Sequence, residues 1–553
     1  MQSFCSLFFV GVFVPATALA YALLPRRARP WLLLAASYTC FWLISGQLVI
    51  FLLACTLATY LAGRGLGVLQ ERQRAAVAQI ARDRNARKAV KRRFRTRMRL
   101  AIAGAALVDV GILIVVKYLG FLSTIADSLL GIVGIDAHLV PPSIGVPIGI
   151  SFYTLQALSY LFDIYRGSVR AERHLGRFAL YMSFFPQLME GPICRYGEMS
   201  SQLWAGEPVR ARNVAHGALR IAWGAAKIII VADRVNLFVK PVFAHPGQWG
   251  GTVIALSAVL YTLQLYCDFS GTMDIVLGVG RIFGIRLPEN FRQPFFSRTA
   301  SEFWQRWHIT LGAWLRDYVF YPVSLSGPVK RFAHAARTLL GMRAGSVLSG
   351  GVALLAVWVL NGLWHGAGWR YLFFGLYYFV LILSAGLLEP VFEAARARLR
   401  INVRARPWIV FQLLRTCCIV CVGELFFRAN GLRAGLQMFA SMVRDFSPVE
   451  LVDGTLLAVG MDAADFAVVG IFVLALTAVG LWRERQTAAD AATDEPERAA
   501  VGGQEQQAAR AAAPIRAHLA WQCAGIAALV LAIVIFGAYG TGYIPLDPIY
   551  AQF

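Results

Sequence analysis

A histidine at the end of an apolar run is the first candidate for chemistry in this sequence. His365 lies in VWVLNGLWHGAGWRYLFFGLYY, and Asn361 precedes it by four residues. If a helix continues through both residues, their side chains share one face. An imidazole titrates near neutral pH and can take the proton of a hydroxyl group. The pattern indicates a general base, but a hydrogen-bonded structural histidine at an interface also fits it.

A second histidine lies among aromatic and basic residues. His308 occurs in SEFWQRWHITLGAWLRDYVFYP. Its neighbours could orient an acyl donor or its phosphates at the cytoplasmic face, and they suit a structural interfacial helix equally well. The candidates for donor binding are Trp304, Arg306, Trp307 and Arg316. Because the sequence has no zinc-ligand spacing, phosphate-binding loop or Gly-x-Ser-x-Gly elbow, we expect neither a metal site nor a bound cofactor.

The composition indicates the class of structure that positions these histidines. Of the 553 residues, 58% are hydrophobic and 15% are charged, against about 45–50% and about 25% in soluble globular proteins. These values exclude a soluble enzyme, a secreted disulfide scaffold and a disordered chain. We therefore predict an all-α polytopic membrane protein.

A membrane-spanning helix needs about 17–25 apolar residues. The sequence contains twelve candidate spans, some of them short, so we expect about 11–12 transmembrane helices. Residues 178–194 are apolar but broken by prolines, and they read as a re-entrant hairpin. Residues 281–343 read as amphipathic interfacial helices anchored by Trp304, Trp307 and Trp314. The twelve spans are 5–24, 31–45, 47–63, 100–117, 143–165, 214–240, 251–277, 346–365, 367–390, 407–427, 465–482 and 518–538.

Positive charge predicts the orientation in the membrane. The net charge is +22, and thirteen lysines and arginines against two acids fall within residues 64–99. We read that segment as a basic cytoplasmic loop that follows the positive-inside bias and touches membrane lipid. An even number of spans separates neighbouring basic loops, so both termini are expected outside the cytoplasm. No recognition module for nucleic acid accompanies the charge.

The chain is expected to divide into four parts. Residues 1–63 hold the first transmembrane helices, and 64–99 form the basic loop. Residues 100–430 form the catalytic core. Residues 431–553 contain the last transmembrane helices and a flexible loop over 484–517, which is rich in Ala, Glu, Asp, Gln and Arg.

Several motifs together resemble one family. FFPQLMEGPICRY (184–196), YCDFSGTMDIVLGVGRIFGIRLPENFRQPFFSRTASEFWQRWHITLGAWLRDYVFYP (266–322) and NGLWHGAGW (361–369) are similar to the bacterial membrane-bound O-acyltransferases. FDIYRG (162–167) and the terminal GTGYIPLDPIYAQF (540–553) extend the resemblance. It covers roughly residues 110–430 and the C-terminus, in the branch of the alginate O-acetylases and the teichoic-acid D-alanyl transfer proteins.

The resemblance implies roles for named residues. His365 matches the family's catalytic histidine and His308 its second important histidine, and Asn361 stands where some relatives have an asparagine. The implied fold is a ring-like helix bundle with a thinned centre, where a cytoplasmic pocket meets an outer funnel. The implied donor is a thioester, either acetyl-CoA or a phosphopantetheine-linked acyl carrier protein. Glu190 departs from the small or amide residue of many relatives, which puts the shape of the donor vestibule in doubt.

The expected function is transfer of an acyl group, with acetyl favoured, from a cytoplasmic thioester across the bacterial inner membrane to a hydroxyl in exopolysaccharide modification. The expected partners are the donor or its carrier protein and, outside, either a separate acyltransferase or the polysaccharide. D-alanyl transfer towards a teichoic-acid-like polymer is the alternative within the family. A polymer or lipid transporter and a non-catalytic scaffold are the alternatives from other classes.

Overall fold

A computed structural model describes residues 6, 8–80, 83–135, 139–140, 145–188, 190–497 and 515–539, with side chains left undescribed at 487–497 and 515–518. Within these ranges the chain is helical and contains no β-strand. Nine stretches of helix there are long and apolar enough to cross a membrane. One of them, Arg29–Gln79, contains two of the predicted spans, and the predicted 143–165 span is a 17-residue helix outside the nine. The prediction of an all-α polytopic membrane protein is confirmed.

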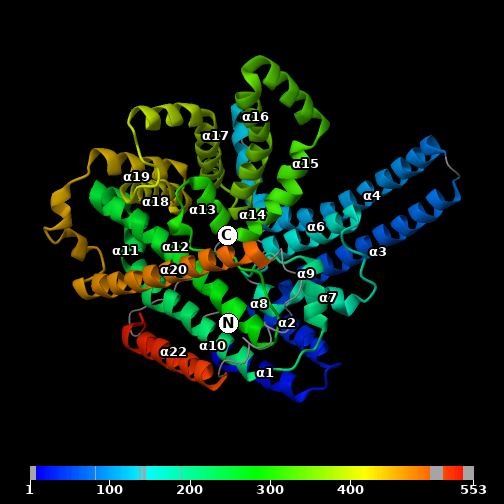
Figure 1. The fold of residues 1–553 in the computed structure, drawn as a ribbon, viewed down its shortest axis with the longest axis horizontal. Coiled ribbons are helices and arrows are strands. Elements are labelled where there is room, and N and C mark those ends of the chain that lie inside the picture. Colours follow the sequence, from blue (N-terminus) through cyan, green and yellow to red (C-terminus); the bar gives the residue numbers. More distant parts are fainter. Residues whose placement is uncertain are drawn as a thin grey trace.

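The helices form one bundle around a central helix, α12 (Figure 1). Four segments within the bundle are π-helical: η1 (Phe9–Phe13), η3 (Ile114–Tyr118), η4 (Lys227–Ala232) and η7 (Arg316–Phe320). The α-helices are α1 (Val14–Leu23), α2 (Arg29–Ser45), α3 (Val49–Gln79), α4 (Arg84–Leu113), α5 (Leu119–Ile132), α6 (Ile150–Arg166), α7 (Leu175–Ser183), α8 (Phe185–Leu188), α9 (Tyr196–Trp204), α10 (Ala211–Ala226), α11 (Asp233–Ala244), α12 (Gly251–Ile282), α13 (Ala300–Arg306), α14 (Ile309–Leu315), α15 (Tyr321–Ser324), α16 (Gly327–His365), α17 (Trp369–Arg398), α18 (Arg406–Arg428), α19 (Leu432–Arg444), α20 (Ala463–Glu497) and α22 (Ile515–Phe536).

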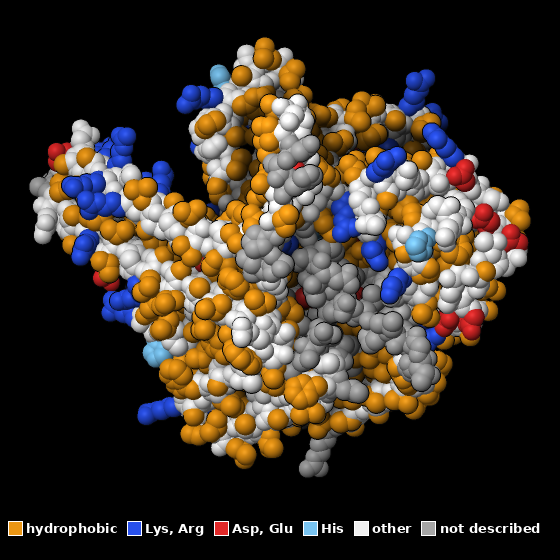
Figure 2. All heavy atoms as spheres, turned by 180° about the vertical axis from the view of Figure 1, so that it is seen from behind, with side chains coloured by type: hydrophobic (Ala, Val, Ile, Leu, Met, Phe, Trp, Pro, Cys, Tyr) orange, Lys and Arg blue, Asp and Glu red, His pale blue; other side chains and the backbone are white. Residues whose placement is uncertain are grey.

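Residues 64–79 and 84–99 of the basic segment are helical, whereas its place as a cytoplasmic connection between spans stays a prediction. Helices α3 and α4 run through it side by side and project from the bundle as an arm (Figure 1). Alanine, arginine, lysine and glutamine are strong helix formers, and the segment consists largely of them. The Asp83 carboxylate also caps α4 by accepting from the backbone N–H groups of Asn85 and Ala86. Blue basic side chains gather on the arm, whereas apolar side chains cover much of the remaining surface (Figure 2).

Helices α10 and α12 approach each other closely. A Cβ atom on Gly224 would lie 2.4 Å from the carbonyl oxygen of Gly271, so glycine is required at this crossing. Lys227 and Asp274 form an ion pair of 2.6 Å between η4 and α12, and both side chains are buried. Arg220 on α10 also contacts the Asp274 carboxylate at 2.9 Å. This paired charge fixes the register of α12 against its neighbours.

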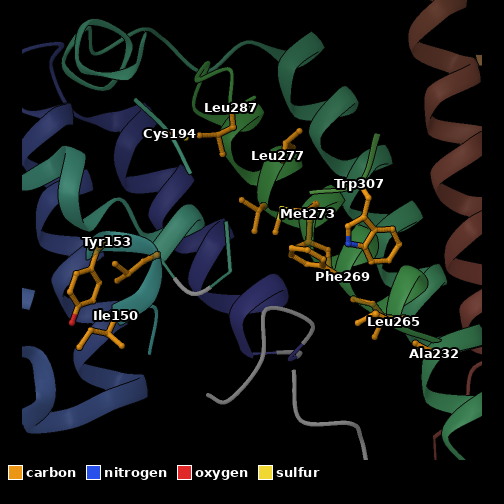
Figure 3. Close-up of a cluster of buried hydrophobic side chains, with 14 of the residues drawn as sticks. Ile150, Tyr153, Cys194, Ala232, Leu265, Phe269, Met273, Leu277, Leu287 and Trp307 are labelled. Atoms are coloured by element: carbon orange, nitrogen blue, oxygen red, sulfur yellow. The ribbon is translucent and has the colours of Figure 1, made fainter. Parts of the chain in front are cut away.

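Apolar side chains of α12 form part of the core that supports His308. Phe269, Met273 and Leu265 project from α12 into this core beside Trp307 (Figure 3). Tyr153 and Ile150 extend the same cluster on α6. The segments that precede and follow His308 therefore rest on a packed wall.

Two other predicted segments differ in detail. Residues 178–188 belong to the short helices α7 and α8 and the turn between them, residues 190–194 are not helical, and all of these residues are buried in protein, as a re-entrant hairpin requires. The tryptophans of 281–343 are not interfacial anchors: Trp307 and Trp314 are buried, and Trp304 packs edge-on against Trp358 and Tyr378. Their rings fill the interior because α13 and α14 lie between α12, α16 and α17 rather than along a surface.

The predicted flexible loop over 484–517 is in part helical. Helix α20 continues to Glu497, and the next described residue is Ile515 at the start of α22. The rest of that predicted loop, and the motif at 540–553, lie outside the described residues.

Candidate functional site

A cavity of about 480 Å³ brings together the residues that the sequence singled out. His308, Asn361 and His365 all line it, although they come from two separate parts of the chain. Trp304, Trp307 and Arg316 line it as well. We call this space the catalytic cavity; its other lining residues are Arg292, Ser301, Gln305, Ile309, Leu311, Gly312, Ala313, Leu315, Leu354, Val357, Trp358 and Ile382.

Helix α16 presents His365 to the catalytic cavity. The helix continues through Asn361 and ends at His365, so the predicted shared face exists. Close packing with α17 holds this end: a Cβ atom on Gly362 would lie 2.3 Å from the Tyr371 carbonyl oxygen. The His365 ring lies between aromatic neighbours, with ring centroids 4.9 Å from Trp364 and 5.1 Å from Phe427. These contacts leave the imidazole one preferred position.

A half-buried lysine in the segment that continues α4 holds the same helix end. Lys117, in the π-helical segment η3, donates to the Trp364 carbonyl oxygen at 2.9 Å and to Ser151 Oγ at 3.1 Å. The neighbouring Tyr118 hydroxyl donates to the Leu363 carbonyl oxygen at 2.5 Å. Since the carbonyl end of a helix carries partial negative charge, an ammonium group there is favourable. Lys117 thus fixes the turn that carries His365 and adds positive charge beside it.

His308 is held by a hydrogen bond to Asn290 in the preceding loop. It joins α13 to α14 with φ 47°, in the left-handed region that few non-glycine residues adopt. Asn290 Oδ1 lies 3.2 Å from His308 Nδ1 and accepts hydrogen bonds from the Thr310 backbone N–H and hydroxyl, both at 3.0 Å. The Asn290 carbonyl oxygen also accepts from the Ile309 backbone N–H at 3.0 Å. Because an amide oxygen only accepts, Nδ1 carries the proton and Nε2 keeps its lone pair.

Burial also sets the charge of His308. Its ring packs edge-on against Phe269 and Trp364, with centroid distances of 5.0 and 5.5 Å. Loss of water lowers the pKa of His308 to about 3. The side chain is therefore neutral near pH 7 and acts through hydrogen bonding rather than as a cation.

The predicted donor-side residues separate into two groups. Trp304, Trp307 and Arg316 line the catalytic cavity, but Arg306 does not. The Arg306 guanidinium instead forms ion pairs with Glu302 at 2.9 Å and with Glu484 of α20 at 2.6 Å. The helical turn of α13 directs the Arg306 side chain away from the cavity and towards these two carboxylates. Glu190 is buried and lies outside the lining of this cavity.

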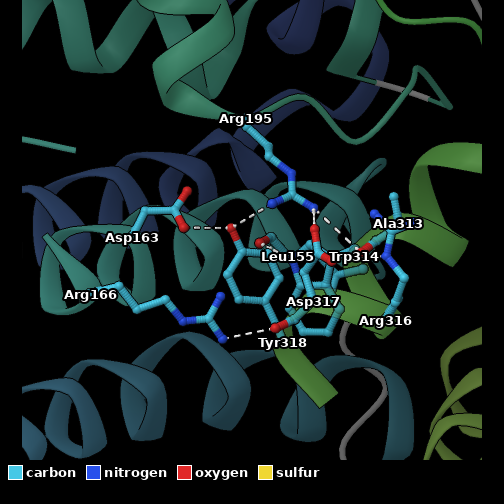
Figure 4. A network of polar contacts seen from close by, with 9 residues as sticks. All are labelled: Leu155, Asp163, Arg166, Arg195, Ala313, Trp314, Arg316, Asp317 and Tyr318. Carbon is cyan, nitrogen blue, oxygen red and sulfur yellow. Dashed lines mark hydrogen bonds and ion pairs between the residues drawn. The ribbon is translucent and has the colours of Figure 1, made fainter. Parts of the chain in front are cut away.

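Arg316 belongs to a charged network at the edge of the cavity (Figure 4). The Asp317 carboxylate accepts from Arg316 Nε at 2.9 Å and from Arg195 at 2.6 Å. Burial alone would raise the pKa of Asp317, but the bonds from the two guanidinium groups outweigh it and hold that pKa below its ordinary value. The Tyr318 hydroxyl donates to Asp163 at 2.8 Å and completes the network.

Comparison with known proteins identifies the family. The sequence model of the membrane-bound O-acyltransferase family matches residues 169–427. A protein of Azotobacter vinelandii described as a probable alginate O-acetylase is 31% identical over 440 residues, which are 79% of this chain and 77% of the relative. The chain belongs to the membrane-bound O-acyltransferase family. It is therefore an acyltransferase, as the resemblance of its motifs predicted.

Two further relatives of this O-acyltransferase carry different names. A peptidoglycan O-acetyltransferase of Helicobacter pylori is 29% identical over 54% of this chain and 57% of the relative. A teichoic acid D-alanyltransferase of Bacillus subtilis is 28% identical over 46% of this chain and 62% of the relative. The family match contains Asn290, His308, Asn361 and His365, whereas Lys117 precedes it.

Sequence reasoning missed Asn290 and Lys117. Asn290 stands in a loop where polar residues are ordinary, so only its place within the 266–322 motif could have drawn attention to it. Lys117 offered a clearer signal, because an isolated lysine in an apolar run is costly and marks a functional position.

Substitution of Lys117 by methionine tests its positioning role in the acyltransferase. Methionine preserves the length of the side chain but removes the ammonium group, and a hydrogen bond to a charged group is worth about 1.5–3 kcal/mol. We expect kcat for acyl transfer to fall roughly tenfold to a hundredfold, with KM for the donor little changed. Steady-state kinetics of the purified protein measures this. Tyr118→Phe removes a neutral bond to the same helix end and should cost less; an unchanged kcat in Lys117→Met would remove the assignment.

The lowered pKa of His308 predicts a pH-dependent stability. In the unfolded chain a histidine binds a proton below about pH 6.5, whereas folded His308 stays neutral down to about pH 3. The contribution of His308 to the free energy of unfolding therefore has its full value above about pH 6.5, and it decreases as the pH falls below that value. Between pH 7.5 and 5.5 the decrease is about 1.4 kcal/mol. Thermal unfolding in detergent should show a smaller pH effect in His308→Asn than in the wild type, and equal pH effects would contradict this.

Proposed function

We propose that this O-acyltransferase moves an acetyl group from a cytoplasmic thioester to a hydroxyl destined for a cell-surface polysaccharide. The observation that carries the proposal is the catalytic cavity, in which His308, Asn361 and His365 meet beside three tryptophans and two arginines. The name of the Azotobacter vinelandii relative, matched over most of both chains, supports acetyl as the acyl group.

His365 is the proposed general base. It takes the proton of the acceptor hydroxyl while the hydroxyl oxygen attacks the thioester carbonyl carbon. The tetrahedral intermediate then collapses, the carbon–sulfur bond breaks, and the proton passes from His365 to the departing thiolate. The Asn361 amide is suited to stabilise the developing oxyanion, a role worth about 2.7–4 kcal/mol for one donor.

His308 is the proposed orienting residue for the donor. Its imidazole is neutral and fixed by Asn290, so His308 Nε2 can accept a hydrogen bond without a change in charge. Trp304 and Trp307 offer apolar walls to the thioester arm, and Arg316 attracts its phosphates. Arg306 has a structural role in this proposal, since it joins α13 to α20 through Glu484.

The proposed location is a bacterial inner membrane, with the basic arm and the donor in the cytoplasm and both termini outside. The positive-inside bias of segment 64–99 supports this orientation. The donor is acetyl-CoA or an acyl group on a phosphopantetheine-bearing carrier protein. The acceptor is the polysaccharide itself or a separate extracytoplasmic acyltransferase that passes the group on.

D-alanyl transfer is the second candidate function. The similarity to the teichoic acid D-alanyltransferase of Bacillus subtilis supports it, but over less than half of this chain. The two functions share the chemistry of the cavity and differ in the acyl group.

Ester analysis distinguishes these candidates. Surface polysaccharide is isolated from cells that carry the wild type or His365→Ala, esters are released with mild base, and mass spectrometry identifies the acid. Loss of acetate in the variant is the expected result, whereas loss of D-alanine would select the second candidate. Unchanged esters, with the variant present in the membrane, would overturn both.

A further inference from the structure

A second cavity lies at the base of the arm. Its volume is about 350 Å³, and α3, α4 and the end of α6 contribute its walls. We call it the arm cavity; it is lined by Gln70, Gln73, Arg74, Arg95, Met98, Tyr165, Arg166 and Gly167. The function proposed above makes no use of this space.

The arm cavity has an excess of positive charge. Arg74, Arg95 and Arg166 come from three different helices, and no acidic residue is among its lining residues. Arg74 and Arg95 form no ion pair with any residue that the structure describes. The acid nearest to them in sequence on α3, Glu71, is paired with Arg173 at 3.1 Å. Since like charges held together repel, an anion between these guanidinium groups would relieve their repulsion.

Side-chain hydrogen bonds hold the walls of the arm cavity in place. The Gln70 amide donates to the Ile164 carbonyl oxygen of α6, and the Gln73 amide donates to the Lys91 carbonyl oxygen of α4 at 3.3 Å. Arg99 Nε donates to the Tyr165 hydroxyl oxygen at 3.0 Å. These bonds join α3, α4 and α6 around the space, so the helices that carry its exposed arginines are held together.

The arm cavity is connected to the catalytic cavity by the network of Figure 4. Arg166 donates to the Asp317 carbonyl oxygen at 2.8 Å, and its guanidinium lies 4.9 Å from the centre of the Tyr318 ring. The Asp317 carboxylate binds Arg316, which lines the catalytic cavity. A single set of polar contacts therefore lies between the arm cavity and the catalytic cavity.

We propose that the arm cavity is a binding site for a phosphate ester. Arginines from three helices that line one cavity suit the charge and the planar oxygen pairs of a phosphate better than a neutral ligand. Two sources have this chemistry at a cytoplasmic face: the phosphates of a nucleotide-bearing thioester donor, and the phosphate of an anionic lipid headgroup. The inference rests on the cytoplasmic placement of the arm in the proposed function, but not on the acyl chemistry.

Binding is measured on the purified full-length protein without any acyl transfer. The test variant is Arg74→Gln/Arg95→Gln, and the matched control is Arg72→Gln/Arg93→Gln, which removes equal charge from exposed positions of the same helices outside the cavity. In phosphatidylcholine nanodiscs, calorimetry follows binding of adenosine 3′,5′-bisphosphate. In parallel, native mass spectrometry counts phosphatidylglycerol retained from mixed nanodiscs.

We expect one of these phosphate esters to bind the wild type and to lose at least tenfold in affinity or retention in the test variant, with less than a twofold change in the control. Loss of nucleotide binding assigns the site to the donor, and loss of phosphatidylglycerol assigns it to lipid. Equal losses in both variants, or no binding of either probe, would overturn the inference. His365→Ala should bind as the wild type does, so failure of the catalytic proposal remains a separate result.

Discussion

Replacement of His365 by alanine is expected to abolish acyl transfer, with a loss of roughly 10²–10⁴-fold or more in kcat. Without the imidazole, no other histidine on α16 reaches the catalytic cavity, and the acceptor hydroxyl keeps its proton. The measurement is release of free thiol from the donor by purified protein in the presence of an acceptor.

A control on the same helix makes the His365 result specific. His334 is exposed on α16 and lies outside the catalytic cavity, so His334→Ala should retain full activity. The His365→Ala protein should also unfold at a temperature close to that of the wild type. Normal thiol release by His365→Ala would show that another group removes the proton.

The second large effect is expected at His308 and at Asn290, which orients its imidazole. His308→Asn should lower kcat by about 10²-fold, because asparagine tolerates the left-handed backbone but lacks the ring nitrogen that faces the donor. Asn290→Ala removes the acceptor shared by His308 and Thr310, so the imidazole loses its orientation. We expect roughly a tenfold loss from that change.

A double-mutant cycle separates orientation from general destabilisation. If Asn290 acts through His308, then Asn290→Ala should cost little once His308 is already asparagine, and the effects on kcat will not add. Additive losses would mean that Asn290 supports the fold alone. Thr310→Val, which removes one of the hydrogen bonds to the Asn290 amide, provides a milder test of the same orienting role.

The sequence predicted the class of fold and the two histidines for clear physical reasons. Apolar runs long enough to cross a bilayer require helices, and a four-residue spacing places Asn361 and His365 on one helical face. The partners that fix these residues were harder to foresee. Lys117 and Trp364 are distant in the sequence, and only the packing of η3 against the end of α16 brings them together.

Two differences between prediction and structure share a cause. The positive charge of segment 64–99 predicts a cytoplasmic connection but not its conformation; its residue types favour helix, and a helix that leaves the membrane does not have to end there. The tryptophans near His308 were taken as membrane anchors because aromatic residues often gather at interfaces. Whether such a ring meets lipid or protein depends on which helices flank it, and local sequence does not contain that information.

The π-helical segments make the positions of three basic side chains depend on the length of the chain there. Lys117, Lys227 and Arg316 all lie in such segments. Lys117 and Lys227 contact partners on other helices, and Arg316 lines the catalytic cavity. Each π-helical turn holds one residue more than the α-helical turn it replaces. Loss of that extra residue would restore an ordinary α-helical turn and leave the flanking helix in register, while the side chains of the segment itself would change direction. Shortening one of these segments by a residue should therefore move its basic side chain out of position without displacing the helices around it.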